Sequence, residues 1–209
     1  MTISALEALD RLREGNQRFL SDVRTDDLVT SQTRRSELVA AQEPFAVILG
    51  CADSRVPSEM VFDQGLGDLF VIRVAGNIVA PPLLGSVEFA ATRFGTRLVV
   101  VLGHSHCGAI EATIGEIRNP SEKLSPNLCS IVNRVRPSIK DLVEDCPEDS
   151  DELVSRAVRA NIRTSVQELG LRSSTLGGLI QTEGLLIVGA EYALETGVVE
   201  FFEGVPEGA

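Results

Sequence analysis

Four continuous apolar runs constrain the fold of this chain more than any other feature. They cover residues 45–50, 69–74, 97–103 and 184–189, and none of them alternates between polar and apolar side chains. A strand with this pattern is covered on both faces, which is typical of a parallel sheet. Helical patterns separate the runs, and strands that alternate with helices pair in parallel through crossover connections. We therefore expect an α/β fold with a Rossmann-like central sheet of four parallel strands flanked by helices.

The segments around these runs predict the remaining elements. Ser4 and Glu7 have the spacing of a capping box and predict a first helix, and a second helix is expected over residues 31–41. A chain of 209 residues is expected to form one domain around one core.

Later helices are marked by proline and by apolar periodicity. Pro57 and Pro82 each suit the first turn of a helix. Residues 151–169 give the clearest helical pattern, with Gly170 expected as its stop. After a turn signal, residues 198–202 predict a fifth strand that pairs antiparallel at the edge of the sheet.

The charge and the ends of the chain exclude several classes of function. The formal net charge is −11, which repels phosphate backbones and anionic membranes, so neither nucleic acid nor a membrane is an expected partner. No stretch approaches the roughly 20 apolar residues that span a bilayer, and the N-terminus does not resemble a signal peptide. We therefore expect a cytoplasmic protein. Its four cysteines are not expected to form a disulfide framework in such a reducing compartment.

Two short segments, each directly after a predicted strand, carry the candidate chemistry. One begins at Cys51 and the other contains His104, His106 and Cys107. Sites in α/β sheets lie beyond the carboxyl ends of the strands, so these loops are expected to converge. Two thiolates and one imidazole suit zinc and leave its fourth position open, as in catalytic sites. Cys51, His104 and Cys107 are the predicted ligands; His106 competes with His104 for this role but is better interpreted as a loop residue.

Asp53 and Arg55 follow the first candidate ligand by two and four residues. They could form an ordinary surface ion pair, which contributes about 0–1 kcal/mol. Beside a metal, Arg55 would instead hold Asp53 ionised and oriented toward a zinc-bound hydroxide. Because two thiolates cancel the formal charge of Zn²⁺, bound water should be acidified less than in a site of three imidazoles. We therefore predict that activity increases toward alkaline pH.

These segments resemble the β-class carbonic anhydrases. The resemblance is carried by Cys51-x-Asp53-Ser54-Arg55 and by His104-x-x-Cys107-Gly108, and it extends to residues 42–46, 73–77 and 184–190. It covers the chain from about Leu9 to Phe202. The family resemblance implies one domain over residues 1–209, with an N-terminal helical arm at 1–41 and a zinc-binding α/β core at 45–202.

The resemblance also implies the reaction and the residues that perform it. A β-carbonic anhydrase is a zinc lyase that reversibly hydrates CO₂ to bicarbonate and a proton, through attack of a zinc-bound hydroxide on CO₂. One zinc ion per chain would be held by the two cysteines and His104, with Asp53 and Arg55 as the catalytic pair. The family pattern implies that the substrate is bound by Gln42, Phe70, Ala75 and Gly108. In the closed state of the family, Asp53 would take the fourth position on zinc.

The resemblance further implies self-association and a regulatory difference. The family forms homodimers, often doubled to homotetramers, in which N-terminal helices pack on a partner subunit; packing on the chain's own core fits the apolar stripe of residues 6–19 equally well. Some bacterial relatives have a Trp-Arg-Tyr bicarbonate site. Here Ile48 stands at the tryptophan position while Arg73 matches the arginine, so that site is expected to be incomplete.

Three alternative functions remain at the level of the sequence. Carbonyl sulfide or carbon disulfide hydrolysis uses isosteres of CO₂ at the same kind of zinc site. A non-catalytic protein with a closed structural zinc would need a permanent fourth ligand, for which Asp53 is the nearby candidate. A nucleotide-binding α/β domain is disfavoured because the glycines at 65–67 precede a strand and lack the third glycine of the fingerprint.

Overall fold

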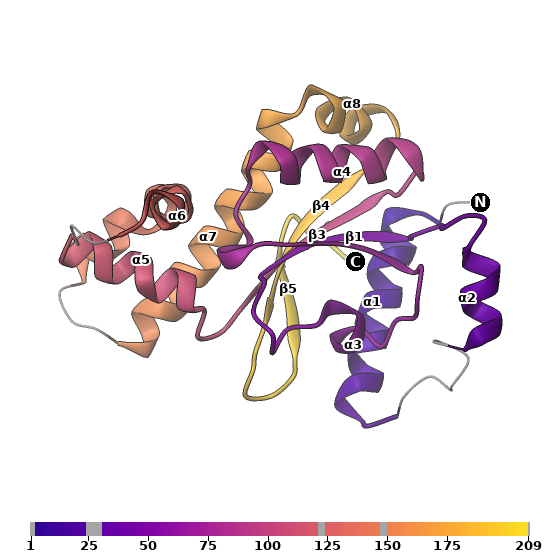
Figure 1. Cartoon of the computed structure of the whole chain (residues 1–209), viewed down its shortest axis with the longest axis horizontal. Helices are drawn as coiled ribbons and strands as arrows, with labels where there is room; N and C mark the ends of the chain where they lie inside the picture. The colour runs from indigo at the N-terminus through magenta and orange to yellow at the C-terminus, as the bar shows by residue number, and fades with distance from the viewer. Residues whose placement is uncertain (1–2, 24–30, 121–123, 147–149, 209) are drawn as a thin grey trace.

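A five-stranded sheet forms the centre of the protein (Figure 1). The computed structural model describes residues 3–23, 31–120, 124–146 and 150–208. The strands lie in the order β2-β1-β3-β4-β5; the first four are parallel, and β5 pairs antiparallel with β4. This architecture confirms the expected fold class. The strands are β1 (Ala46–Gly50), β2 (Leu69–Arg73), β3 (Leu98–His104), β4 (Leu186–Tyr192) and β5 (Val199–Glu203).

Helices cover both faces of the sheet. They are α1 (Ala5–Leu20), α2 (Gln32–Leu38), α3 (Ser58–Val61), the 3₁₀ turn η2 (Ala75–Asn77), α4 (Pro81–Arg93), α5 (Gly108–Arg118), α6 (Pro126–Asp145), α7 (Asp151–Arg172) and α8 (Ser174–Thr182). Successive side chains of a strand point to opposite faces, and β3 is buried on both. Val99 and Val101 pack with α4 and α7, whereas Val100 and Leu102 pack with α1. In Figure 1, α4 and α8 accordingly lie on the opposite side of the sheet from α1 and α3.

The first helix begins as predicted, because the Ser4 hydroxyl accepts a hydrogen bond from the Glu7 amide at 3.2 Å. Leu9 and Leu12 of α1 are fully buried within this one chain. The apolar stripe of α1 therefore contributes to the chain's own core.

Among the residues that the structure describes, no helix combines the length and the apolar character that a membrane crossing requires.

Two predicted helix ends were wrong. The second helix spans only Gln32–Leu38 rather than residues 31–41. Gly170 does not stop α7, which continues to Arg172, since glycine inside a helix costs only about 1 kcal/mol. The helix ends at Ser173, whose hydroxyl accepts from the amide of Leu176 at 3.0 Å and so begins α8.

Candidate metal centre

The carboxyl ends of β1 and β3 bring the three predicted ligands together. Cys51 follows β1, His104 is the last residue of β3, and Cys107 lies just before α5. One ligand atom from each of the three side chains lies within 4.8 Å of the other two, and the two sulfur atoms are 4.0 Å apart. All three residues are buried, with His104 at 0% exposure. The convergence that strand order predicts is therefore present in the fold.

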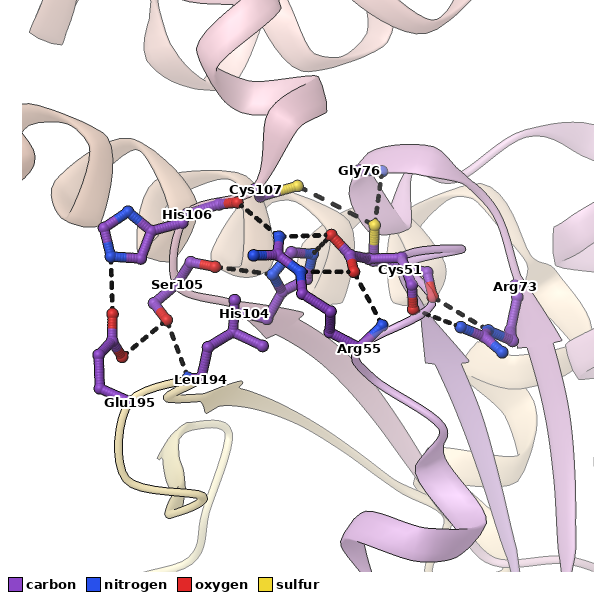
Figure 2. A network of polar contacts seen from close by, with 11 residues as sticks. Cys51, Arg55, Arg73, Gly76, His104, Ser105, His106, Cys107, Leu194 and Glu195 are labelled. Atoms are coloured by element: carbon purple, nitrogen blue, oxygen red, sulfur yellow. Dashed lines mark hydrogen bonds and ion pairs between the residues drawn. The ribbon is translucent and has the colours of Figure 1, made fainter.

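The loop after β3 orients the His104 ring (Figure 2). Its Nδ1 donates to the backbone carbonyl of Ser105 at 2.7 Å, which leaves Nε2 toward the thiols. Nε2 is buried and has no hydrogen-bond partner among the residues that the structure describes. A buried ring nitrogen without a partner is costly, and a bound metal would satisfy it. The fit of this site to a metal ion rests on that unpaired atom and on the soft donor set around it.

His106 is turned away from the ligand group. Its backbone is left-handed, with φ of 50°, and its Nε2 lies 2.6 Å from a carboxylate oxygen of Glu195 in the loop between β4 and β5. The other oxygen of Glu195 accepts from the Ser105 hydroxyl at 3.0 Å (Figure 2). His106 is therefore held by this surface loop, and His104 is the imidazole beside the thiols.

The environment of Cys51 favours a thiolate. A hydrogen bond from the Cys107 thiol, the nearby His104 imidazole and the Gly76 amide, which donates across 3.4 Å, hold the pKa of Cys51 well below its usual value, although burial opposes them. The pKa of Cys107 is raised in turn, by its hydrogen bond to Cys51 and by burial. The first proton therefore leaves this pair readily and the second does not. A divalent cation between the sulfurs would favour loss of the second proton, because a coordinating thiol is deprotonated.

Asp53 and Arg55 form the expected pair at the edge of the site. The guanidinium donates to both carboxylate oxygens, at 2.9 and 2.7 Å, and the Arg55 amide adds a bond of 3.0 Å. These bonds from Arg55 hold the pKa of Asp53 well below its ordinary range. One carboxylate oxygen lies 3.8 Å from His104 Nε2. An ionised, oriented carboxylate therefore stands beside the ligand group.

Arg73 fixes the backbone that carries these residues. It donates to the carbonyl of Cys51 at 3.2 Å and to the carbonyl of Asp53 at 2.6 Å (Figure 2). Ile48, which the resemblance aligns with a regulatory tryptophan of some relatives, is fully buried in the core.

Two polar residues on α7 that the sequence analysis did not identify also contact the site. Asn161 donates to the carbonyl of Gly76 at 2.8 Å, and Ser165 donates to the carbonyl of Asn77 at 3.1 Å. Both are buried on a helix face that is otherwise apolar. The sequence does contain a signal for these contacts: the two polar residues are four positions apart among apolar neighbours. A polar side chain at a buried helix position needs a hydrogen-bond partner.

The four predicted substrate-binding residues separate into two groups. Ala75 and Gly108 are chain neighbours of Gly76 and Cys107, so they lie at the site. Phe70 pairs with Val47, four residues before Cys51 and thus about 13 Å away along the strand. Gln42 lies before β1 and lines a cavity of about 850 Å³ with α2 and Phe94. Within one chain, Gln42 and Phe70 are thus remote from the cysteines.

Comparison with known proteins gives a consistent result. The sequence profile of a family described as carbonic anhydrase matches residues 46–199. The chain is 41% identical to carbonic anhydrase 2 of Mycobacterium tuberculosis, over 89% of this chain and 87% of that protein. It is 39% identical to the carbonic anhydrase of Mycolicibacterium smegmatis, over 90% and 89% of the two chains. Among solved structures, the β-carbonic anhydrase CcaA matches with a TM-score of 0.73 and 27% identity, over 94% of this chain and 95% of that one.

Proposed function

The chain belongs to the β class of the carbonic anhydrase family, and we propose that it catalyses the zinc-dependent, reversible hydration of CO₂ to bicarbonate and a proton. The observation that carries the proposal is the buried group of two sulfurs and one unpaired imidazole nitrogen, with an ionised carboxylate beside it. Such a donor set, open at one position, is typical of catalytic rather than structural zinc.

Cys51, His104 and Cys107 would hold one zinc ion per chain. When bound, zinc acts as a Lewis acid that lowers the pKa of a water molecule and so supplies a nucleophile. The protein's own contribution begins with Gly76 and Ser105, whose backbone groups orient the Cys51 sulfur and the His104 ring. These contacts fix which atom of each ligand faces the metal, and they would reduce the reorganisation needed during turnover.

Asp53 and Arg55 would control the attacking water. The Asp53 carboxylate would accept a hydrogen bond from that water and would thereby direct a lone pair at the carbon of CO₂. Arg55 keeps the carboxylate ionised and fixes both of its oxygens. Ala75 and Gly108 would border the space in which CO₂ is held.

Gln42 and Phe70 would bind substrate only in an assembly, because both lie far from the ligands of their own chain. We therefore infer a homodimer, or a homotetramer built from such dimers, in which one subunit supplies these side chains to the site of another. The fold is shared with a tetrameric β-carbonic anhydrase of Sordaria macrospora, at 22% identity and a TM-score of 0.72 over 80% of this chain and 85% of that one. In this assembly, residues 1–41 would also contact the partner subunit.

A reducing, cytoplasmic location suits the site. All four cysteines lie in described parts of the chain and none forms a disulfide. Oxidation of Cys51 and Cys107 would remove two of the three proposed ligands, and disulfides are rare in the cytosol.

The function is tested by stopped-flow hydration of CO₂ together with metal analysis. The wild-type protein should contain one zinc per chain, and Asp53→Ala should retain zinc while losing about 10²–10⁴ in kcat. Asp10→Ala is the control, because Asp10 is an exposed carboxylate of α1 that pairs with Arg13. An Asp53→Ala enzyme as fast as the Asp10→Ala enzyme would contradict the proposal. So would a wild-type protein that turns over carbonyl sulfide faster than CO₂.

A further inference from the structure

Two buried polar side chains on α7 face the turn η2. Asn161 is 2% exposed and Ser165 is 3% exposed, and they lie one helical turn apart. Val158 and Ile162 on the same helix pack into the apolar core. A polar group at such a position loses its hydration and is tolerated only when it is hydrogen-bonded. The partners of Asn161 and Ser165 therefore indicate what the two residues do.

Both side chains bind backbone carbonyls of η2. The Asn161 amide donates to the Gly76 carbonyl at 2.8 Å, and the Ser165 hydroxyl donates to the Asn77 carbonyl at 3.1 Å. The Ser138 hydroxyl of α6, which donates to the Val135 carbonyl at 2.6 Å, also lies 3.4 Å from the side-chain oxygen of Asn161. Asn161 of α7 thus contacts both α6 and the turn.

The turn needs these contacts because its backbone is unusual. Gly76 and Asn77 are both left-handed, with φ of 71° and 41°. Only glycine adopts this region freely, and asparagine does so at a small cost. Two successive residues of this kind expose their carbonyls to one side, toward α7. Without Asn161 and Ser165, these buried carbonyls would lack their side-chain donors, and the turn would relax to a less strained backbone.

The same turn presents its amide to the ligand group. The N–H of Gly76 points at Cys51 Sγ across 3.4 Å (Figure 2). A hydrogen bond of this kind withdraws electron density from a thiolate and fixes the direction of its lone pairs. The distance depends on the conformation of the turn, and the turn is held by α7.

We propose that Asn161 and Ser165 are positioning residues: by tethering η2, they hold the Gly76 amide on the Cys51 sulfur and so set the donor strength and direction of this metal ligand. Neither side chain touches substrate or metal; both act through the peptide backbone. The inference rests on the proposed zinc-binding role of Cys51. It adds that the donor strength of Cys51 depends on two side chains of α7, which follow Cys51 by more than a hundred residues in the sequence.

Cobalt substitution and zinc competition test this proposal. In the cobalt-loaded protein, the energy of the sulfur-to-cobalt charge-transfer band reports the electron density on the thiolates. Loss of the hydrogen bond to sulfur should move the band to lower energy in Asn161→Ala and in Ser165→Ala. The same variants should bind zinc about tenfold more weakly in competition with a chromophoric chelator, as is typical when a partner of a metal ligand is lost.

Two further variants separate positioning from general stability. Val158→Ala removes buried volume from the same helix but no hydrogen bond, so it should lower the melting temperature and leave the cobalt band unmoved. Ser165→Thr keeps a hydroxyl at this position and should restore the wild-type band. If Asn161→Ala fails to fold, the comparison of Ser165→Ala with Ser165→Thr still decides the question.

The outcomes distinguish this inference from the proposed function. A wild-type protein that binds neither cobalt nor zinc would overturn the proposed function and the inference with it. A wild-type protein with a normal band, together with unshifted bands in Asn161→Ala and Ser165→Ala, would overturn the inference alone. A shift in Val158→Ala as large as in those variants would also overturn it, because the band would then follow stability.

Discussion

Gly103 of β3 and Gly189 of β4 lack side chains at the point where α7 packs on the sheet, and we call this gap the notch. A methyl group added at Gly103 would lie 2.5 Å from Cδ1 and 2.7 Å from Cγ1 of Ile162. A methyl group at Gly189, on the neighbouring strand, would lie 2.7 Å from Cγ2 of the same side chain. Ile162 is fully buried and its branched side chain has little rotamer freedom, so it cannot move aside without shifting the helix.

These distances predict a strong energetic coupling between Gly103 and Ile162. Gly103→Ala should cost about 1–3 kcal/mol through overpacking. Ile162→Ala alone should cost about 2–5 kcal/mol, because it leaves a cavity in the core. In the double variant the added methyl group enters the space that Ile162 vacates. The combined loss should therefore fall short of the sum by at least about 1 kcal/mol, as for other residues in contact.

Urea unfolding of the four proteins measures this coupling, with far-ultraviolet circular dichroism as the signal. Protein and zinc concentrations must be identical throughout, because both subunit association and metal binding raise apparent stability. Gly85→Ala is a suitable control, since a methyl group there meets no atom within 4 Å. Single-variant losses that add to within about 0.5 kcal/mol would refute the packing argument.

Three further predictions concern pH and assembly. CO₂ hydration should rise from neutral to alkaline pH, because two thiolate ligands would cancel the formal charge of Zn²⁺ and bound water would be acidified less; a flat stopped-flow profile would contradict this. Arg159→Met should destabilise the protein most near neutral pH. Arg159 lowers the pKa of Glu200. It also lowers the pKa of Glu191, although burial outweighs this effect and the pKa of Glu191 is raised. The contribution of Arg159 to the free energy of unfolding is therefore lost as both carboxylates protonate in acid. Urea unfolding at pH 7 and pH 4 should show the gap between wild type and variant closing; an equal gap would refute the assignment. Finally, mixing Gln42→Ala with Asp53→Ala chains should give more activity than either alone, because one site of the mixed dimer would be intact; no gain would show that Gln42 does not serve a partner.

The sheet and the ligand group could be predicted because their signals are local. Each ligand segment directly follows an apolar run, and the carboxyl ends of parallel strands share one edge. Cys51 and His104 could therefore be brought together without any knowledge of the helices. The antiparallel fifth strand was equally accessible, since a short turn separates it from β4.

The polar contacts of α7 could not be predicted in the same way. Asn161 and Gly76 are 85 residues apart, and Ser165 and Asn77 are 88 residues apart. Which carbonyls face a helix depends on how the helix crosses the sheet, and this crossing involves contacts between distant residues, such as Ile162 against Gly103 and Gly189 of the notch. The end of α7 was misjudged for a related reason: the propensity of Gly170 is weak beside the capping of α8 by Ser173.

The predicted substrate-binding residues mark a second limit of sequence reasoning. Gln42 and Phe70 were predicted from the family resemblance, yet Gln42 precedes β1 and Phe70 lies near the amino end of β2, whereas the predicted ligands lie at the carboxyl ends of β1 and β3. Position in a motif does not specify which subunit a residue serves. The proposal that Gln42 and Phe70 serve a partner subunit rests on where the fold places them.

X-ray absorption at the zinc edge of the purified protein tests whether two cysteines and a histidine bind the metal. We expect one zinc per chain with two sulfur neighbours at about 2.3 Å and nitrogen or oxygen neighbours at about 2.0–2.1 Å. Cys51→Ser should reduce the sulfur count from two to one, and Cys129→Ser, at a partly buried cysteine outside the ligand group, should leave it unchanged. A zinc site without sulfur, or a protein without stoichiometric zinc, would contradict this expectation.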